Sequence, residues 1–389
     1  MTRLKLFGKD ILRKLNTSVG NVLPVVDLRG GGNIDGASKT FLTGEAPIKG
    51  DIDTYHYDKT AKAPYWIELF REGVTVPPLF MLVLYNVRMV SRGVIIHQNK
   101  VLLESAIFQR EYLDKLLANH SILVSLYKRQ GTTISNAIPL LNKLSNNYYH
   151  WTTESLTRLA ALSEYSNEDY YDYNIIIAAD APAFERESLI ALFKVKEEKI
   201  ITWKNNDKGI IEKCILISYP FIRTEETVMM NVYNLPLDRL LNTISLRNIS
   251  SLTNEAEYIV ISRKNVNQRK LLGEEKILNA FPAIPFKIIY TEEMSYIEQV
   301  RTFRNAKIII APHGAGLVNL VYVTKKPVVI EIFPTTRKIR DAGAYHQIAR
   351  EMEIDYHLLV KEPANDEQDI EITDTILSEI KDILSLYKY

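Results

Sequence analysis

The stretch Ala306-Lys-Ile-Ile-Ile-Ala-Pro-His-Gly-Ala-Gly-Leu-Val-Asn-Leu-Val-Tyr-Val323 decides the predicted fold. Lys307 to Ala311 is a β-branched run of the kind that is buried on both faces of a parallel sheet, and Pro312 ends it because proline cannot donate to the strand ladder. The segment His313-Gly-Ala-Gly316 predicts a turn with positive φ angles, in which the backbone approaches a ligand closely. Leu317 to Val323 predicts a short apolar helix, so the stretch is a strand, a turn and a helix of an α/β sheet.

A helix that starts directly after such a turn directs its free N–H groups and its positive dipole end beyond the strand. In open α/β sheets, phosphorylated ligands bind at this position, outside the carboxyl end of the strand. The sequence therefore predicts that His313, Gly314, Ala315 and Gly316 bind such a ligand. The alternative is a tight strand-to-helix turn in which the glycines only permit close packing.

The length and composition limit the classes of protein to which this chain can belong. A length of 389 residues exceeds what one hydrophobic core usually organises, so two domains are predicted. Basic and acidic side chains nearly cancel, with a formal net charge of +1, which argues against nucleic acid as a partner. The single cysteine, Cys214, lies in an apolar run and is predicted to be a buried strand residue, and a chain without internal disulfides fits a reducing compartment. No apolar segment approaches the ~18 residues that span a bilayer, and no signal peptide is apparent.

The N-terminal region shows weaker patterns. From Thr2 to Leu15, basic residues alternate with apolar residues near one helix face, which predicts either weak association with a membrane surface or an ordinary docking helix. The segment from Gly30 to Tyr57 lacks periodicity and is predicted to be an irregular arm. Its Asp51 and Asp53 have a spacing that metal sites use, but they lie in this arm, and no metal site is predicted.

The next region contains β-like runs that begin at Leu79, Val87, Gly93 and Lys100. Turn residues separate these runs, so a small antiparallel meander is predicted, with His97 as a packed strand residue. A helix-like segment follows near residues 109–118.

Farther along the chain, strands and helices alternate in two units, which predicts an α/β fold with two Rossmann-like lobes. In the first unit, strands are predicted at 134–141, 174–178, 199–203 and 211–217, and helices at 148–162 and 183–193. In the second, strands are predicted at 257–261, 286–290, 307–311, 328–332 and 355–359, and helices at 274–280, 294–303, 344–352 and the apolar-faced C-terminus. The polar helix at 235–254 predicts a boundary between residues 1–240 and 241–389. Two such lobes commonly hold substrates in the cleft between them.

Basic residues follow the strand predicted at 257–261. Ser262, Arg263 and Lys264 stand at its carboxyl end, and Arg269 follows on the loop. Cations and helix N–H groups at one sheet edge suit a diphosphate, because fixed donors stabilise the negative charge that grows as it leaves. The alternative is a solvated basic loop.

Two carboxylates stand in informative places. Glu331 lies in an apolar strand, so it must either reach a ligand, where it would accept hydrogen bonds from sugar hydroxyls, or find a structural partner at a neighbouring helix. Glu154 is four residues from His150 on one helix face, within mutual reach. One of this pair would accept a proton from an acceptor hydroxyl while the other holds it in place. The alternative is a structural pair, with Arg158 pairing to Glu154.

Together these stretches resemble glycosyltransferase family 61. The resemblance rests on motifs in matching order and spacing over about Asn147 to Leu359, namely Asn147-Tyr-Tyr-His-Trp151 with Glu154 and Arg158, Ser262-Arg-Lys264 with Arg269, and Ala311-Pro-His-Gly-Ala-Gly-Leu-Val-Asn-Leu-Val321 with Val329-Ile-Glu-Ile-Phe-Pro334. The family spans bacterial polysaccharide-biosynthesis enzymes, plant xylan arabinosyl- and xylosyltransferases, and animal O-linked N-acetylglucosaminyltransferases.

The resemblance implies an inverting glycosyltransferase of GT-B fold, with an interlobe cleft and a nucleotide-sugar donor, usually a UDP-sugar, on the C-terminal lobe. The implied donor-binding residues are Arg263, Lys264, Arg269, His313, Gly314, Ala315, Gly316 and Glu331. The implied general base is Glu154 or His150, and the implied acceptor-side residues are Asn147, Tyr149, Trp151 and Arg158. Because cations and N–H groups can stabilise the leaving diphosphate, no metal or other cofactor is required.

The chain departs from the family pattern at two positions. Glu154 stands where the family commonly has Asp, and Gly273 stands where an Asn commonly precedes the glutamate of the Arg-rich motif, so a donor contact is in doubt there. Without an anchor or signal, a cytoplasmic enzyme of surface polysaccharide synthesis is expected, with residues 2–15 peripheral at the inner membrane face. The competing hypothesis is a non-catalytic nucleotide-binding or assembly protein. A nicotinamide-dependent oxidoreductase is disfavoured because no strand is followed by G-x-G-x-x-G and a later acidic residue. The sugar, the acceptor and the oligomeric state stay open.

Overall fold

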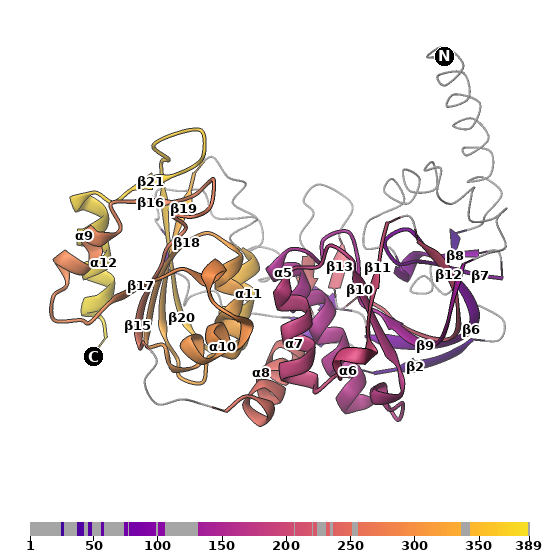
Figure 1. Cartoon of the computed structure of the whole chain (residues 1–389). Coiled ribbons are helices and arrows are strands. Elements are labelled where there is room, and N and C mark those ends of the chain that lie inside the picture. Colours follow the sequence, from indigo (N-terminus) through magenta and orange to yellow (C-terminus); the bar gives the residue numbers. More distant parts are fainter. Residues whose placement is uncertain are drawn as a thin grey trace, which may run out of the picture. The chain divides into compact units, whose positions relative to one another are not determined.

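The computed structural model describes residues 25–26, 37–42, 46–48, 56–57, 74–76, 78–98, 100–105, 131–205, 207–219, 221–223, 231–233, 236–250, 256–335 and 343–387. Contacts divide the described chain into two compact units (Figure 1). Unit 1 draws on residues 1–44, 78–186 and 194–220, and unit 2 on residues 45–77, 187–193 and 221–389. The boundary predicted at 240 and 241 falls within helix α8 (Pro236–Asn248), which belongs to unit 2.

Unit 1 is built on a mixed sheet with the order β1-β8-β7-β6-β12-β9-β10-β11, and β2 also pairs with β6. Its strands are β1 (Val25–Val26), β2 (Ser38–Phe41), β6 (Phe80–Val90), β7 (Val94–His97), β8 (Lys100–Leu102), β9 (Thr132–Pro139), β10 (Asn174–Ala178), β11 (Ile200–Trp203) and β12 (Lys208–Ile217). The predicted meander β6-β7-β8 is confirmed. It is not a separate element, however, because β6 pairs antiparallel with β12 from Met81 to Val90.

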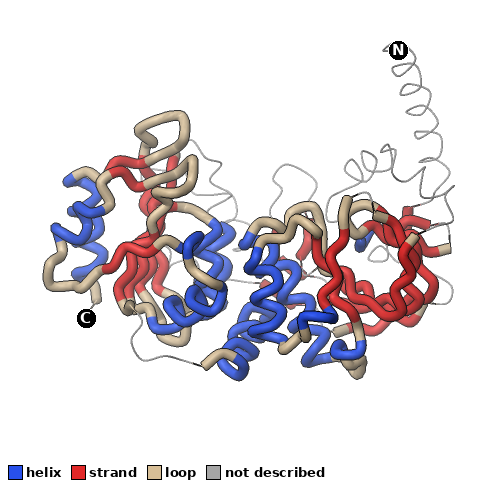
Figure 2. Tube along the Cα trace, in the orientation of Figure 1, coloured by secondary structure: helices blue, strands red, loops and turns tan. Residues whose placement is uncertain are grey.

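The helices of unit 1 gather beside this sheet (Figure 2). They are α5 (Tyr148–His150), the π-helical segment η2 (Trp151–Leu156), α6 (Thr157–Tyr165) and the first turn of α7 (Ala183–Phe193), whose residues 187–193 belong to unit 2, with short 3-10 turns η1 (Leu103–Ser105), η3 (Tyr170–Asp172) and η4 (Glu197–Lys199). The predicted burial of Cys214 in a strand is confirmed, and burial raises the pKa of its thiol. His97 is also buried in its strand, as predicted.

Unit 2 contains a parallel sheet in the order β17-β15-β18-β19-β20-β4. Its strands are β4 (His56–Tyr57), β15 (Tyr258–Ile261), β17 (Lys287–Ile289), β18 (Ile308–Pro312), β19 (Val328–Pro334) and β20 (Asp355–Lys361). Smaller pairs are β3 (Ala46–Ile48) with β5 (Val74–Val76), β13 (Phe221–Arg223) with β14 (Asn231–Tyr233), and β16 (Leu271–Leu272) with β21 (Ile370–Glu371). The strands predicted at 257–261, 286–290, 307–311, 328–332 and 355–359 are therefore confirmed, and they pair in parallel.

Helices cover both faces of the unit 2 sheet. Helices α9 (Glu275–Ala280) and α12 (Asp374–Ser385) pack their apolar residues on one face, where Ile277, Ile376 and Ile380 join Val260 and Ile310 in one core. The predicted docking of the C-terminal helix is thus confirmed. The 3-10 helix η6 (Ala315–Tyr322) contacts α8, α10 (Tyr296–Asn305) and α11 (Gly343–Glu351), and a 3-10 turn, η5 (Thr291–Glu293), precedes α10.

A buried carboxylate makes the stability of unit 2 depend on pH. Asp238, in the first turn of α8, is 3% exposed, and burial, helped by nearby Glu351, raises its pKa to about 8. Burial thus outweighs the helix dipole, which favours an anion there. Because an unfolded aspartate has a pKa near ~3.9, the stability from Asp238 is full below about pH 4 and is lost as the pH rises through about 8. We expect Asp238→Asn to raise the free energy of unfolding at pH 8 by roughly 5 kcal/mol and to change it little at pH 4.

Urea denaturation at both pH values measures this difference. The control is Asp382→Asn on the exposed side of α12, which we expect to leave the pH dependence unchanged. If wild type and Asp238→Asn lose stability in parallel between pH 4 and pH 8, another group carries the effect.

The segment from Gly30 to Tyr57 is not irregular throughout, which corrects its prediction. Within it, β2 pairs with β6 and β4 pairs with β20. Strands this short at a sheet edge carry no detectable alternation, because one neighbour and few side chains define them. The N-terminal helix at 2–15, Asp51, Asp53 and the helix near 109–118 lie outside the described residues. Within the described part of the chain, helices that could cross a membrane are absent.

Candidate active site

The glycine turn of unit 2 follows β18 directly. His313 continues the ladder, since its N–H donates to the Ile332 carbonyl at 3.2 Å, and η6 begins at Ala315. The predicted positive φ is wrong, because Gly314 has φ 179°, which is extended backbone. Gly314 is needed for space instead: a Cβ there would fall on the guanidinium of Arg263, with Cζ at 3.2 Å. Gly314 thus allows the guanidinium of Arg263 to approach the backbone closely.

The basic loop after β15 reaches the same turn. Arg269 donates from Nη1 to the His313 carbonyl at 3.2 Å, and Arg263 donates from Nε to the Gln268 carbonyl at 3.1 Å. Arg269 has φ +61°, a left-handed conformation that costs an L-residue roughly 1–2 kcal/mol. The structure therefore brings Arg263 and Arg269 together with Gly314, as predicted, and holds Arg269 in a strained conformation there.

A buried hydrogen bond fixes the start of the basic loop. Ser262 donates from Oγ to Glu274 at 2.8 Å and accepts the N–H of Lys264 at 3.1 Å, while the Lys264 side chain is exposed. Burial raises the pKa of Glu274. Gly273, which stands where a family asparagine is expected, has φ +77°, so glycine suits this turn sterically. Glu274 thus holds the start of the basic loop through its hydrogen bond with Ser262.

His313 and Glu331 form a buried pair beside the turn. His313 Nδ1 lies 2.6 Å from Glu331 Oε1, and the hydroxyl of Tyr356 donates to Oε2. Glu331 is 0% exposed, so its carboxylate has found structural partners and holds the histidine, rather than facing a sugar. Tyr356 was not predicted. Its only sequence signal is its position on β20, because parallel pairing of β19 and β20 brings it near Glu331.

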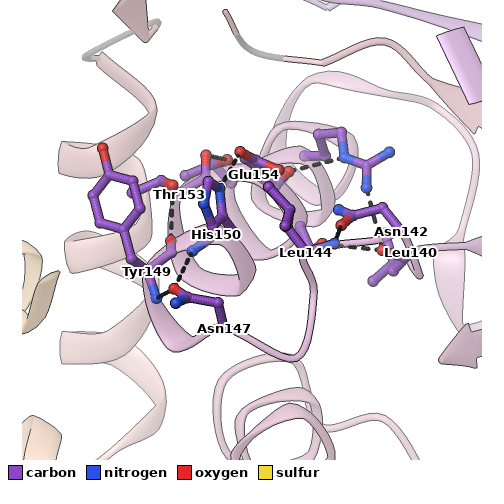
Figure 3. A network of polar contacts seen from close by, with 11 residues as sticks. Leu140, Asn142, Leu144, Asn147, Tyr149, His150, Thr153 and Glu154 are labelled. Carbon is purple, nitrogen blue, oxygen red and sulfur yellow. Dashed lines mark hydrogen bonds and ion pairs between the residues drawn. The ribbon is translucent and has the colours of Figure 1, made fainter. Parts of the chain in front are cut away.

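The second cluster lies in unit 1, where α5 begins. Asn147 caps this helix by accepting the N–H groups of Tyr149 and His150 at 3.0 and 3.4 Å. His150 Nδ1 lies 2.7 Å from Glu154 Oε1, and Figure 3 shows the two side chains turned toward each other. The predicted contact is therefore confirmed. The His150 side chain is 22% exposed, whereas that of Glu154 is 0% exposed.

Side-chain donors support the π-helical segment that carries Glu154. Thr153 donates to the Tyr149 carbonyl at 2.8 Å, Thr157 to the Thr153 carbonyl at 2.6 Å, and Arg158 from Nε to the Glu154 carbonyl at 2.8 Å. Each donor reaches the carbonyl four residues earlier, which in an α-helix receives a backbone N–H. The wider turn is therefore hydrogen-bonded, and π-helical turns of this kind are frequent at functional sites.

Two residues predicted to contact an acceptor are instead buried supports. Arg158 is 1% exposed, donates to the carbonyls of Ile217 and Leu140 at 3.2 and 3.3 Å, and stacks on Tyr219 at 4.3 Å. Its predicted pairing with the Glu154 carboxylate is replaced by the bond to the Glu154 carbonyl. Trp151 is 0% exposed. Asn147 is exposed and Tyr149 is half-buried, so both retain surface that an acceptor can reach.

Metal ligands do not gather in either cluster. Over the residues that the structure describes, no group of three or more His, Cys, Asp or Glu side chains is placed to hold a metal ion. In both clusters a histidine is paired with a buried carboxylate, and in unit 2 two arginines meet at the backbone turn.

Comparison with known proteins shows which family the two clusters resemble. A family model described as Glycosyltransferase 61 matches residues 148–330, a range that contains His150, Glu154, Arg263, Arg269 and His313. The chain is thus similar to the glycosyltransferase 61 family over residues 148–330. The resemblance seen in the motifs is thereby confirmed, and the match reaches from α5 of unit 1 to β19 of unit 2.

Individual glycosyltransferase 61 relatives align over shorter stretches. The chain is 32% identical to the Xenopus laevis protein O-linked-mannose β-1,4-N-acetylglucosaminyltransferase 2 over 125 residues, which is 31% of this chain and 19% of that protein. It is 28% identical to the Gallus gallus EGF domain-specific O-linked N-acetylglucosamine transferase over 103 residues, 25% of this chain and 18% of that protein. The Mus musculus counterpart is 26% identical over 103 residues, 25% of this chain and 19% of that protein. The alignments thus span less than a fifth of these relatives.

Proposed function

We propose that this chain is an inverting glycosyltransferase that moves a sugar from a nucleotide sugar, a UDP-sugar, to a hydroxyl of a glycan acceptor in surface polysaccharide biosynthesis. The observation that carries the proposal is the meeting of Arg263 and Arg269 with the turn at Gly314. Similarity to the glycosyltransferase 61 family supports it, since the relatives are named as glycosyltransferases. We assign the fold to the GT-B class on the same grounds.

The proposed donor site lies at the carboxyl edge of the unit 2 sheet. Arg263, Lys264 and Arg269 and the N–H groups that follow Gly314 would hold the diphosphate, because fixed donors stabilise the charge that develops on a leaving group. His313, held by Glu331, would complete the site. Arginines and backbone donors can do this without a metal, so we propose that no cofactor is required.

The proposed acceptor site lies at the start of α5. Asn147 and Tyr149 offer polar and aromatic surface to a glycan, and the pair His150 and Glu154 supplies the base for its hydroxyl. Displacement at the anomeric carbon by a hydroxyl activated in this way inverts its configuration.

Screening nucleotide sugars tests the proposal. A ligand that binds only the folded chain raises its melting temperature, by an amount that grows with ligand concentration. UDP-N-acetylglucosamine is the first donor to test, because the relatives transfer N-acetylglucosamine by name. We expect stabilisation by UDP and by one UDP-sugar, and release of UDP from that sugar. Binding of UDP without release or transfer from any donor would instead indicate a non-catalytic nucleotide-binding protein, and the absence of any binding would reject the donor site.

The proposed location is the cytoplasm, with residues 2–15 at the inner face of a membrane. Cosedimentation with anionic and with neutral vesicles tests the second part, since basic residues attract anionic lipid. Equal recovery with both kinds of vesicle and with none would reject it.

Filling the space at Gly314 gives a milder test of the same site. We expect Gly314→Ala to weaken UDP binding about tenfold, because the new Cβ displaces the Arg263 guanidinium. Arg239→Ala is the control, since it removes a cation of the same unit that pairs with Glu351 and Glu353 away from this turn. Isothermal titration with UDP measures both. Equal losses in the two variants would show that Arg263 is not the group that matters.

A further inference from the structure

The two members of the acceptor-side pair differ in access to solvent. The Glu154 side chain is 0% exposed and that of His150 is 22% exposed, although their Nδ1 and Oε1 atoms are only 2.7 Å apart. A proton acceptor must come within hydrogen-bond distance of the hydroxyl that it deprotonates, about 2.6–3.2 Å. His150 can do so because its side chain is partly exposed, whereas Glu154 would first have to leave its buried position.

Resting on the proposed function, we infer that His150 is the catalytic base, acting through Nε2, and that Glu154 is a positioning residue. The imidazole uses Nδ1 for Glu154, so this contact fixes the tautomer that carries its proton on Nδ1 and leaves the lone pair on Nε2. The buried carboxylate also stabilises the imidazolium that forms when the proton arrives. A distance of 2.7 Å is in the range of a charge-assisted hydrogen bond.

Neighbouring side chains hold the helical turns that carry His150 and Glu154. Asn147 caps the helix at the N–H of His150, and the Thr153, Thr157 and Arg158 side chains brace the turn that bears Glu154. Two other titratable groups interact with Glu154: Arg158 donates to its backbone carbonyl, and Tyr219 interacts with it electrostatically. Arg158 is a permanent cation, and burial raises the pKa of Tyr219 to about 12, so neither changes charge near neutral pH.

The step balances as follows. The acceptor hydroxyl gives its proton to Nε2 of His150, its oxygen forms a bond to the anomeric carbon, and the bond from that carbon to the diphosphate oxygen breaks. The bonding electrons leave on the nucleoside diphosphate, and the imidazolium later returns its proton to water. The products are the inverted glycoside and the nucleoside diphosphate.

Kinetics of the full chain with the donor found in the screen test this assignment. We expect His150→Ala to lower kcat/KM about 10²- to 10⁴-fold with UDP affinity unchanged, and exogenous imidazole to restore part of the rate, since the imidazole that it would replace is 22% exposed. We expect Glu154→Gln to lower kcat about tenfold to a hundredfold with little change in KM. It should also shift the acid limb of the pH–rate profile to lower pH, because the anion that favours the imidazolium is gone. Glu154→Asp should recover part of the loss.

The control is Glu168→Gln, which removes a carboxylate of unit 1 that pairs with Lys213 at 2.9 Å outside this site. We expect it to leave the rate and the pH profile unchanged. Near wild-type kcat/KM in folded His150→Ala, together with an inactive Glu154→Gln, would overturn the assignment in favour of Glu154 as the base. A rate loss in Glu154→Gln without any shift of the acid limb would give Glu154 a merely structural role. Wild-type turnover separates these outcomes from failure of the proposed function, which would leave the wild type itself without turnover.

Discussion

Replacing Arg269 by alanine is expected to weaken UDP binding about tenfold to a hundredfold. A hydrogen bond to a charged group contributes about 1.5–3 kcal/mol, and each 1.4 kcal/mol is a factor of ten in affinity. Arg269 donates to the His313 carbonyl, so the variant removes a cation and also a tie between the basic loop and the glycine turn. Alanine keeps an L-side chain at φ +61°, so the backbone strain there is unchanged.

Two further variants separate charge from geometry. Arg269→Lys keeps the positive charge but lacks the planar fork, and we expect an intermediate affinity. Arg239→Ala removes a cation of the same unit that pairs with Glu351 and Glu353, at the opposite, amino end of β20. We expect it to leave UDP affinity within about twofold, since exposed pairs contribute little. If Arg239→Ala weakens binding as much as Arg269→Ala, the effect is one of net charge, and the site assignment is wrong.

Truncation of Trp151 is expected to cost unit 1 about 3–5 kcal/mol, the usual range for a fully buried aromatic side chain. Trp151 is the first residue of the π-helical segment η2 and follows His150 directly, so loss of its buried ring leaves a cavity next to this turn. The midpoint of urea unfolding, followed by circular dichroism, measures the change.

An exposed aromatic residue of the same unit provides the comparison. Tyr171 is 49% exposed, and we expect Tyr171→Ala to change stability by less than about 1 kcal/mol. A small effect of Trp151→Ala would mean that the site collapses around the deletion and that the helix does not depend on this ring.

The sequence predicts much of the fold because hydrophobic patterns are local. Strand β10 and helix α7 have the predicted limits, since a buried β-branched run and an amphipathic stretch are each visible within their own residues. The strands β2 and β4 were missed because their pairing partners lie far away in the chain. The meander was predicted, but its pairing with β12 depends on a register that no local pattern encodes.

The site shows the same division. The meeting of Arg263 and Arg269 with Gly314 could be predicted, because carboxyl ends of parallel strands share a sheet edge. The reason for the glycine could not, since it depends on where the Arg263 side chain turns. The burial of Arg158 and the contact of Tyr356 with Glu331 also depend on tertiary structure, so the sequence alone does not predict them. Arg158 appears functional in the sequence because it lies beside the motif, and only the structure shows that it donates to backbone carbonyls.

Strand β4 has a consequence for how the protein is made. His56 and Tyr57 cover the edge of β20, whose residues are synthesised roughly 300 positions later. During translation, β4 can therefore pair with β20 only after nearly the whole polypeptide has left the ribosome. A fragment cut before Phe221 to isolate the later half would expose β20 to its own copies, and we expect such a fragment to aggregate.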